Sequence, residues 1–246
     1  MVKHDYEYKF EAPFSFPPEM ALITKNYLNR LDTLNRIKGT DTDVIPTICI
    51  SRKLGIGARE IASMVADRMD YTVVDRELLN YIASQVDLKE KTVALFDERY
   101  PGKLQELLAI TFGKKGFVEN DYVRYLFRAV FAFVNLQPTI FVGRGTHFIL
   151  PRDKVLAVRI IGSKSYRVKR LADSMEISKK EAEKQIKQAD DEQRAFFKRV
   201  FNKSSAHASE FDLVVNCDHF SNLKCVAEIV FNAFAQKFEQ EAIKEQ

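Results

Sequence analysis

From residue 45 onward, short apolar runs alternate along the chain with longer amphipathic segments. The runs are rich in β-branched residues and almost continuously apolar, which is typical of strands buried on both faces of a parallel sheet. The expected strands are IPTICI (45–50), YTVVD (71–75), TIFVG (139–143), VLAVRIIG (155–162) and FDLVVNC (211–217). The expected helices cover residues 58–70, 76–86, 122–136, 163–175 and 221–238, with one more beginning after residue 178. Joined by right-handed crossovers, these elements predict an α/β doubly wound domain.

Two connections in this pattern are too long to be simple crossovers. Residues 76–138 predict a helical insertion between the second and third strands. Residues 176–210 predict a strongly charged arm, whose helix starts with the capping-box pair Ser178 and Glu181.

Residues 1–44 differ from the rest of the chain. An aromatic and proline-rich start is followed by apolar residues at helical spacing from Met20 to Leu34. We therefore expect an N-terminal extension with an amphipathic helix, followed by one domain over residues 45–246. The helix fits two interpretations: it packs on the main domain, or it associates with a partner or with a second copy of the chain.

The composition narrows the class of protein. With 246 residues, 46% of them hydrophobic, the chain can bury one large core. The net charge of +4 is compatible with an anionic small molecule but is too weak for a dedicated nucleic-acid binder. The three cysteines lack metal-ligand spacing, and their odd number argues against a disulfide framework. No stretch reaches the ~20 apolar residues of a membrane span and the N-terminus does not resemble a signal peptide, so the expected location is the cytoplasm.

The stretch ISRKLGIGARE (50–60) joins an expected strand to an expected helix through two glycines. Gly55 and Gly57 permit positive φ and close backbone approach, so amides of this loop could face phosphate oxygens at the helix N-terminus. The usual G-x-x-x-x-G-K-[ST] pattern would place a lysine after the second glycine, and Ala58 occupies that position. The same residues also fit a tight strand-to-helix turn without a ligand.

Three charges near the loop bear on the missing lysine. Lys53 or Arg59 could supply a cation, although the planar fork of arginine does not reproduce an ammonium group. The run ARE (58–60) also lacks the Ser or Thr whose hydroxyl would hold Mg²⁺, and Glu60 brings a carboxylate instead. Its carboxylate could bind the ion, repel phosphate, or only complement the helix dipole.

Polar residues follow two other expected strands. Asp75 ends the second strand, where it could cap the next helix or contact a ligand. Arg144 lies between Gly143 and Gly145 after the third strand, at the sheet edge where ligands bind in such domains. Because an arginine between two glycines has little structural purpose there, we expect an anion beside it. We expect the nearby His147 to be structural.

Two expected helices carry charges at regular spacing. Arg124 and Arg128 share one helix face at i and i+4, which fits a solvated face as well as an anion contact. In the charged arm, Lys187, Asp191 and Arg194 also recur on one face. By itself, that spacing is typical of a solvated helix surface.

Several motifs, taken in order, resemble the cytidylate kinase-like family, divergent relatives of bacterial cytidylate kinase. They are TICISRKLGIGAREIASMVADRM, YTVVDRELL, IFVGRGTHFIL, DDEQRAFFKRVF and FDLVVNC, and the resemblance extends over residues 45–235. It implies a P-loop nucleoside-monophosphate-kinase-like fold, a parallel sheet flanked by helices, with a helical monophosphate-binding insertion and a lid arm. It also implies ATP as donor with Mg²⁺, and CMP or dCMP as acceptor. Members of this branch carry glycine-Arg-Glu, or a similar run, where cytidylate kinases carry Lys-Gly-Thr, so Ala58 looks like a family trait.

The resemblance assigns roles to individual residues. The expected contacts of the ATP phosphates are Gly55, Ile56, Gly57, Ala58, Arg59 and Glu60. The expected contacts of the monophosphate are Asp75, Arg124, Arg128 and Arg144. The expected catalytic residues are Lys187, Asp191 and Arg194, which match the lid spacing Arg-x-x-x-Asp-x-x-Arg with lysine at its first position. The sequence identifies no metal ligand.

Two functions therefore remain open. The first is an enzyme that phosphorylates a nucleoside monophosphate with ATP. The second is a nucleotide-binding regulatory protein without turnover, with the N-terminal helix as its partner surface. The missing lysine, the missing hydroxyl and the lack of a clear acidic Mg²⁺ ligand favour the second. In both cases the expected ligands are nucleotides, and neither nucleic acid nor a membrane is expected as a partner.

Overall fold

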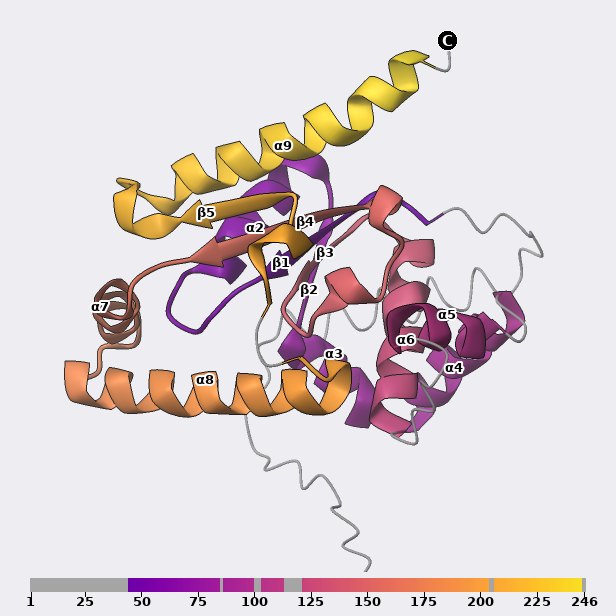
Figure 1. Cartoon of the computed structure of the whole chain (residues 1–246), viewed down its shortest axis with the longest axis horizontal. Helices are drawn as coiled ribbons and strands as arrows, with labels where there is room; N and C mark the ends of the chain where they lie inside the picture. The colour runs from indigo at the N-terminus through magenta and orange to yellow at the C-terminus, as the bar shows by residue number, and fades with distance from the viewer. Residues whose placement is uncertain (1–43, 85, 100–102, 113–120, 204–205, 245–246) are drawn as a thin grey trace, which may run out of the picture.

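A single parallel sheet forms the centre of the computed structural model, which describes residues 44–84, 86–99, 103–112, 121–203 and 206–244 (Figure 1). The strands lie in the order β2-β3-β1-β4-β5, and each neighbouring pair is parallel. Their bounds are β1 Thr47–Ser51, β2 Thr72–Asp75, β3 Thr139–Val142, β4 Val155–Ile161 and β5 Leu213–Asn216. All five strands expected from the apolar runs are present, and the α/β class is confirmed. The helix expected between residues 20 and 34 lies outside the described residues.

The register of the strands brings particular residues to one edge of the sheet. Asp75, the last residue of β2, is level with Val142, the last residue of β3. Ser51, the last residue of β1, is level with Arg159 of β4. Because parallel strands end at the same edge, the segments that follow β1, β2 and β3 all begin beside one another there.

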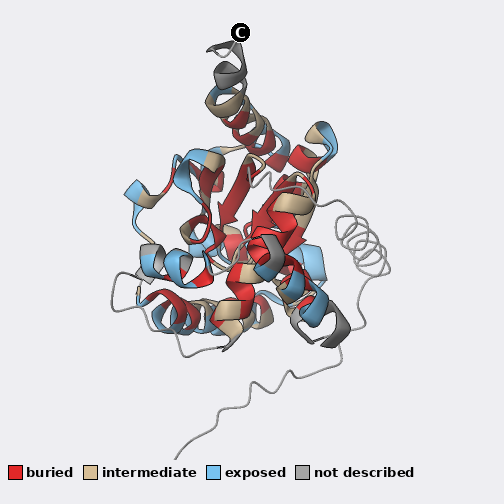
Figure 2. Cartoon of the chain, turned by 90° about the vertical axis from the view of Figure 1, so that its right-hand side faces the viewer, coloured by how far each residue is buried: buried red, intermediate tan, exposed pale blue. Residues whose placement is uncertain are grey.

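Helices cover both faces of the sheet, as Figures 1 and 2 show. The main helices are α2 Ala58–Met69, α3 Arg76–Ser84, α4 Val86–Arg99, α5 Lys103–Phe112, α6 Asp121–Leu136, α7 Lys164–Met175, α8 Lys179–Phe201 and α9 Leu223–Lys244. Helices α2 and α9 pack on one face of the sheet, and α3 to α6 gather on the other. Among the described residues, no helix has the length and hydropathy of a membrane span.

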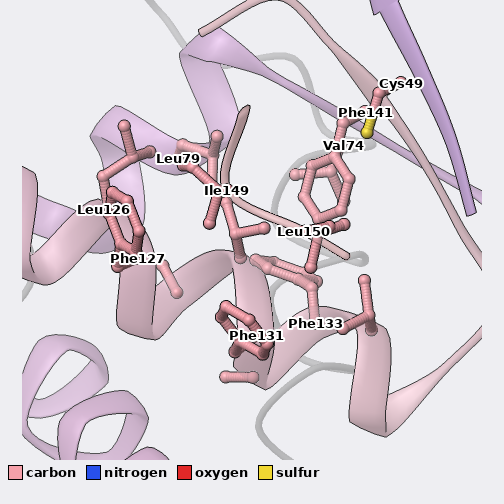
Figure 3. Close-up of a cluster of buried hydrophobic side chains, with 14 of the residues drawn as sticks. Cys49, Val74, Leu79, Leu126, Phe127, Phe131, Phe133, Phe141, Ile149 and Leu150 are labelled. Atoms are coloured by element: carbon pink, nitrogen blue, oxygen red, sulfur yellow. The ribbon is translucent and has the colours of Figure 1, made fainter. Parts of the chain in front are cut away.

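Aromatic side chains dominate the core between the sheet and the insertion. Phe127, Phe131 and Phe133 of α6 are buried with Phe141 of β3 and Cys49 of β1 (Figure 3). The rings of Phe133 and Phe141 meet edge to face with centroids 6.3 Å apart. Removing one such ring typically costs about 3–5 kcal/mol, so this cluster anchors α6 to the strands.

The charged arm contains one long helix, α8, of 23 residues. Ser178 caps it as the sequence predicts, because its hydroxyl accepts a hydrogen bond from the Glu181 amide at 3.2 Å. Near its start, Ala182 and Ile186 pack against α7. Near its end, four residues join the large core: Phe196, Phe197, Val200 and Phe201. Figure 1 shows α8 running from beneath α7 to α3.

Candidate functional site

A cavity of about 850 Å³ lies at the carboxyl ends of β1 and β4, bounded by helices α7 and α8. Its described lining holds seven basic side chains and two acidic ones. The basic residues are Arg52, Lys53, Arg159, Lys164, Arg167, Lys187 and Arg194, and the acidic ones are Asp190 and Asp191. This excess of positive charge in a walled hollow favours an anionic ligand.

The glycine loop forms part of the cavity wall and leads into α2. Gly57 is the N-cap of α2 with a φ of 81°, and no described side chain caps the first turn. The first N–H groups of a helix lack partners within the helix, and together with the helix dipole they attract anions. Ile56 is buried and lines the cavity. Phosphate binding by residues 55–60 stays a prediction that this geometry allows.

Positive φ at both loop glycines, and close backbone packing at Gly55, account for glycine at these positions. A Cβ at Gly55 would lie 2.6 Å from the backbone oxygen of Arg167 in α7. A Cβ at Gly57 would lie 2.4 Å from Cδ1 of Leu223 and 2.6 Å from Nε of Arg170. Both glycines also have positive φ, 82° and 81°. Their presence is therefore explained without a phosphate, a reason that the sequence did not reveal.

The two charged residues at the start of α2 are ion-paired within the protein. Nη1 of Arg59 lies 3.5 Å from Oδ2 of Asp75. Glu60 accepts a hydrogen bond from Arg170 of α7. Neither Arg59 nor Glu60 belongs to the described cavity lining. Their contacts thus give no support to Arg59 as a substitute for the lysine, or to Glu60 as a ligand of Mg²⁺.

An ion pair that sequence reasoning missed joins the two helices beside the cavity. Arg167 of α7 donates to both carboxylate oxygens of Asp190 in α8, at 3.0 and 2.8 Å. Its Nε also donates to the backbone oxygen of Leu54 in the glycine loop at 2.8 Å. Lys53 approaches the same carboxylate at 3.4 Å. Because arginines on amphipathic helices usually face solvent, the sequence carries no signal that Arg167 is only 4% exposed.

The three residues expected in the lid are brought together on the cavity side of α8. Lys187, Asp191 and Arg194 all line the cavity. Arg194 and Asp191 form an ion pair one turn apart, and the Arg194 side chain is exposed. Its guanidinium is therefore accessible to a ligand, and the catalytic role of the three residues stays a prediction.

Asp75 acts as the cap that the sequence allowed. Its Oδ1 accepts a hydrogen bond from the Leu78 amide at 2.9 Å, at the start of α3. Burial raises the pKa of the Asp75 carboxyl, and the negative charge of Glu77 raises it further. The Leu78 amide and the Arg59 guanidinium lower it. A contact with a substrate would come in addition to this cap.

Arg144 has structural partners that the sequence did not suggest. It adopts a φ of 56° and donates to Oδ1 of Asn80 at 3.1 Å. Its guanidinium lies 4.5 Å from the ring centroid of Phe196 in α8 and 5.8 Å from that of Tyr122 in α6. The expectation that an arginine at this position has little structural purpose is therefore wrong. Arg144 connects β3 to α3, α6 and α8, and a phosphate contact would be a second role.

The two arginines of α6 are not part of the described cavity lining. Arg128 donates to both carboxylate oxygens of Asp97 in α4, at 3.1 and 3.3 Å, and lies 6.0 Å from the ring centroid of Phe96. Arg124 lies one turn earlier and is partly exposed. The structure therefore directs Arg128 toward α4, and its role as a monophosphate contact gains no support from its contacts.

His147 is buried among aromatic side chains, as expected for a structural histidine. It lies in a short 3₁₀ segment after β3, and its ring is 4.0 Å from that of Phe148 and 4.7 Å from that of Phe211. Burial, together with the nearby positive charges of Arg152 and Lys203, lowers the pKa of His147 to about 3. The imidazole is therefore neutral at physiological pH.

Carboxylates that could hold Mg²⁺ directly are scarce. Among the described residues, no three His, Cys, Asp or Glu side chains cluster as metal ligands would. Both cavity carboxylates, Asp190 and Asp191, are ion-paired with arginine. Mg²⁺ commonly keeps several waters and binds chiefly through substrate phosphates, so this donor set fits an ion that arrives with a nucleotide.

The fold and this site define a class of protein. A parallel sheet in the order 2-3-1-4-5, a glycine loop between β1 and α2, and a charged helix beside the basic cavity are the plan of a P-loop kinase. The model of the cytidylate kinase-like family matches residues 47–219, and the chain belongs to this family. Membership makes this a kinase-like protein, as the motifs of the sequence suggested.

Among the solved structures that resemble the chain, at least one superposes well enough to support the fold. An uncharacterized protein from Eubacterium ventriosum ATCC 27560 superposes with a TM-score of 0.59 at 18% identity, over 79% of this chain and 99% of that one. A shikimate kinase from Bacteroides thetaiotaomicron matches at 13% identity with a TM-score of 0.38, over 78% of this chain and 98% of that one. A gluconokinase from Sinorhizobium meliloti 1021 matches at 10% identity with a TM-score of 0.45, over 82% and 99%. No curated protein matches the chain significantly.

Proposed function

We propose that this protein transfers the γ-phosphoryl group of ATP to a nucleoside monophosphate. The observation that carries the proposal is the basic cavity at the carboxyl ends of β1 and β4, beside α8. Phosphoryl transfer needs little covalent help from a protein; it needs the two substrates held in line and the charge of the moving group neutralised. A hollow lined by seven described cations and two carboxylates supplies that charge.

In this proposal the glycine loop binds the donor. The uncapped N–H groups at the start of α2 contact the ATP phosphates, and Mg²⁺ enters with the nucleotide. Lys187 and Arg194 reach the phosphates from α8. Arg194 then exchanges its ion pair with Asp191 for one with a phosphate group.

The acceptor binds beside the ends of β2 and β3, where Asp75 and Arg144 lie. CMP or dCMP is the proposed acceptor, and the description of the family is its support. Arg144 already spans β3, α3 and α8 through Asn80 and Phe196, so a monophosphate there would contact a side chain that is held in place.

A second candidate is a nucleotide-binding protein without turnover. Ala58 occupies the position of the loop lysine, and Glu60 is ion-paired with Arg170. These two observations favour a site that binds ATP and does not transfer its phosphoryl group.

One experiment separates the two candidates. The purified protein is mixed with ATP and Mg²⁺ and with CMP, dCMP, UMP, AMP or a non-nucleotide hydroxyl acceptor, while ADP formation and ATP binding are measured in parallel. ADP formed with CMP or dCMP supports the proposed kinase. ADP formed only with another acceptor identifies that acceptor as the substrate instead. ATP binding without ADP formation supports the second candidate, and the absence of ATP binding contradicts both.

A contaminating kinase is excluded with two variants of α8. Arg194→Ala removes a cavity cation, whereas Lys198→Ala removes an exposed lysine one turn later that does not line the cavity. ADP formation that belongs to this protein falls in the first variant and persists in the second.

A further inference from the structure

Arg52 follows the central strand β1 directly, in a stretch of backbone held by neighbouring helices. Its carbonyl oxygen accepts a hydrogen bond from Nε2 of Gln193 in α8 at 2.9 Å. Two residues later, the carbonyl oxygen of Leu54 accepts from Arg167 at 2.8 Å. The position from which the Arg52 side chain extends is therefore fixed by α7 and α8.

The Arg52 guanidinium differs from the other arginines of the cavity. Arg167 is paired with Asp190, Arg194 with Asp191, and Arg159 donates to the backbone oxygen of Ala206. Within the part of the chain that the structure describes, no ion pair or hydrogen bond engages the Arg52 side chain. The donors of this guanidinium are thus available to a ligand.

This availability is costly for the protein. Burial lowers the pKa of the Arg52 guanidinium, and the positive charges of Arg76 and Arg144 lower it further, against the opposing effect of Glu77 and Asp75. A half-buried charge that lacks a close partner loses hydration without a compensating hydrogen bond. An anion bound beside Arg52 would remove that cost.

Arg52 lies between the proposed binding sites of the two substrates. The residue lines the cavity in which the ATP phosphates are proposed to bind. Its electrostatic neighbours Asp75 and Arg144 lie at the ends of β2 and β3, on the acceptor side. β1 lies between β3 and β4 in the sheet, so a side chain that leaves its carboxyl end is adjacent to both sides.

We propose that Arg52 contacts the phosphoryl group as it moves from donor to acceptor, and so supplies the cation that the loop lacks at Ala58. This inference rests on the proposed function. In the step itself, the bond between the γ-phosphorus and the β–γ bridging oxygen breaks, a bond from the γ-phosphorus to an acceptor phosphate oxygen forms, and ADP leaves. Arg52 neutralises the negative charge of the moving group, which is the role that arginine guanidinium groups have in other phosphoryl transfers. It transfers no proton.

The test uses inorganic pyrophosphate as a probe, because it presents two linked phosphates without a base or a reaction. Its dissociation constant is measured by calorimetry for the parent, Arg52→Met and Arg52→Lys, and the melting temperature of each is measured without ligand. The matched control is Arg68→Met, which removes an arginine of α2 that pairs with Glu228 outside the cavity.

We expect Arg52→Met to raise the dissociation constant of pyrophosphate at least tenfold. Its ligand-free melting temperature should equal or exceed that of the parent. That combination distinguishes a residue that awaits a ligand from a structural one, whose loss lowers the melting temperature. Arg52→Lys keeps the charge without the fork and should bind pyrophosphate with intermediate affinity. Arg68→Met should bind it as the parent does.

The outcomes separate this inference from the proposed function. Unchanged pyrophosphate affinity in Arg52→Met, or a lower melting temperature with unchanged affinity in Arg52→Lys, overturns the role of Arg52. Tenfold weaker pyrophosphate binding by Arg52→Met, together with a parent that forms no ADP with any acceptor, overturns the kinase and keeps Arg52 as an anion contact. A parent that binds neither pyrophosphate nor ATP overturns both.

Discussion

Arg167 and Asp190 form a bidentate ion pair across α7 and α8, with nitrogen–oxygen distances of 3.0 and 2.8 Å. The same guanidinium donates to the Leu54 carbonyl in the glycine loop. One side chain therefore fixes the loop and both helices relative to one another, and the shape of the cavity depends on it.

Arg167→Ala should destabilise the protein strongly. Removing one partner of a buried ion pair typically costs about 3–5 kcal/mol, and here the Asp190 carboxylate would lose both of its shorter hydrogen bonds while keeping the more distant Lys53 at 3.4 Å. The comparison is Arg68→Ala, which breaks an ion pair with Glu228 that is half exposed on both sides and should cost about 0–1 kcal/mol. Urea unfolding measures both losses. Equal losses would show that the Arg167–Asp190 pair contributes no more than a surface contact.

Gly55→Ala should cost more stability than Gly143→Ala. The two glycines have similar positive φ, 82° and 91°, so the backbone strain of a side chain is alike, about 1–2 kcal/mol. A Cβ at Gly55 also meets the Arg167 carbonyl oxygen at 2.6 Å, whereas a Cβ at Gly143 has nothing within 4 Å. The clash should add about 1–3 kcal/mol in unfolding experiments. A larger loss for Gly143→Ala would contradict the packing of the loop on α7.

His147 should make the protein less stable in mild acid. Its pKa is about 3 in the folded state, below the ordinary 6.5, so the unfolded chain binds a proton that the folded protein refuses. Stability therefore falls as pH drops below about 6.5, by about 1.4 kcal/mol per pH unit from this residue, until the pH nears the folded pKa. His147→Phe should lose about 1.4 kcal/mol less than the parent between pH 7.5 and pH 5.5. Identical losses in the two proteins would rule out a neutral, buried His147.

Arg194→Ala should lower kcat far more than it weakens the binding of ATP. A cation that stabilises the moving phosphoryl group acts mainly in the transition state, and such arginines are worth about 10³–10⁵ in rate. We expect at least a tenfold loss of kcat, with the ATP dissociation constant changed by less. Lys198→Ala, on the exposed side of α8, should match the parent in steady-state kinetics. Full turnover in Arg194→Ala would remove the residue from the catalytic assignment.

The sequence predicts the architecture well because buried parallel strands are legible as continuous apolar runs. Each expected strand is found within two residues of its expected ends, and Ser178 caps α8 as its pattern indicates. Helical spacing also places Lys187, Asp191 and Arg194 on one face, and that face lines the cavity.

Contacts between residues distant in the chain were beyond the sequence. Asn80, the partner of Arg144, is 64 positions away, and nothing in a helix beginning with RELL indicates that an amide points at the next strand. Arg167 and Asp190 each look like solvated charges on amphipathic helices until the two helices are packed together. The sequence suggested a phosphate as the reason for the loop glycines, whereas their positive φ and the packing of the α7 backbone against Gly55 already favour glycine there.

The burial of both ends of α8 has a consequence for how ligands come and go. Lifting the helix as a rigid body would carry Ile186, Phe196 and Phe197 into water, at about 1.5–3 kcal/mol for each side chain. Because this cost is large, we expect the helix to stay packed on the domain rather than to open as a hinged lid. Ligands would then enter and leave the cavity as exposed side chains such as Arg194 rotate. Such rotations take picoseconds to nanoseconds. The amide hydrogens of α8 should then exchange with solvent only as fast as the whole domain opens.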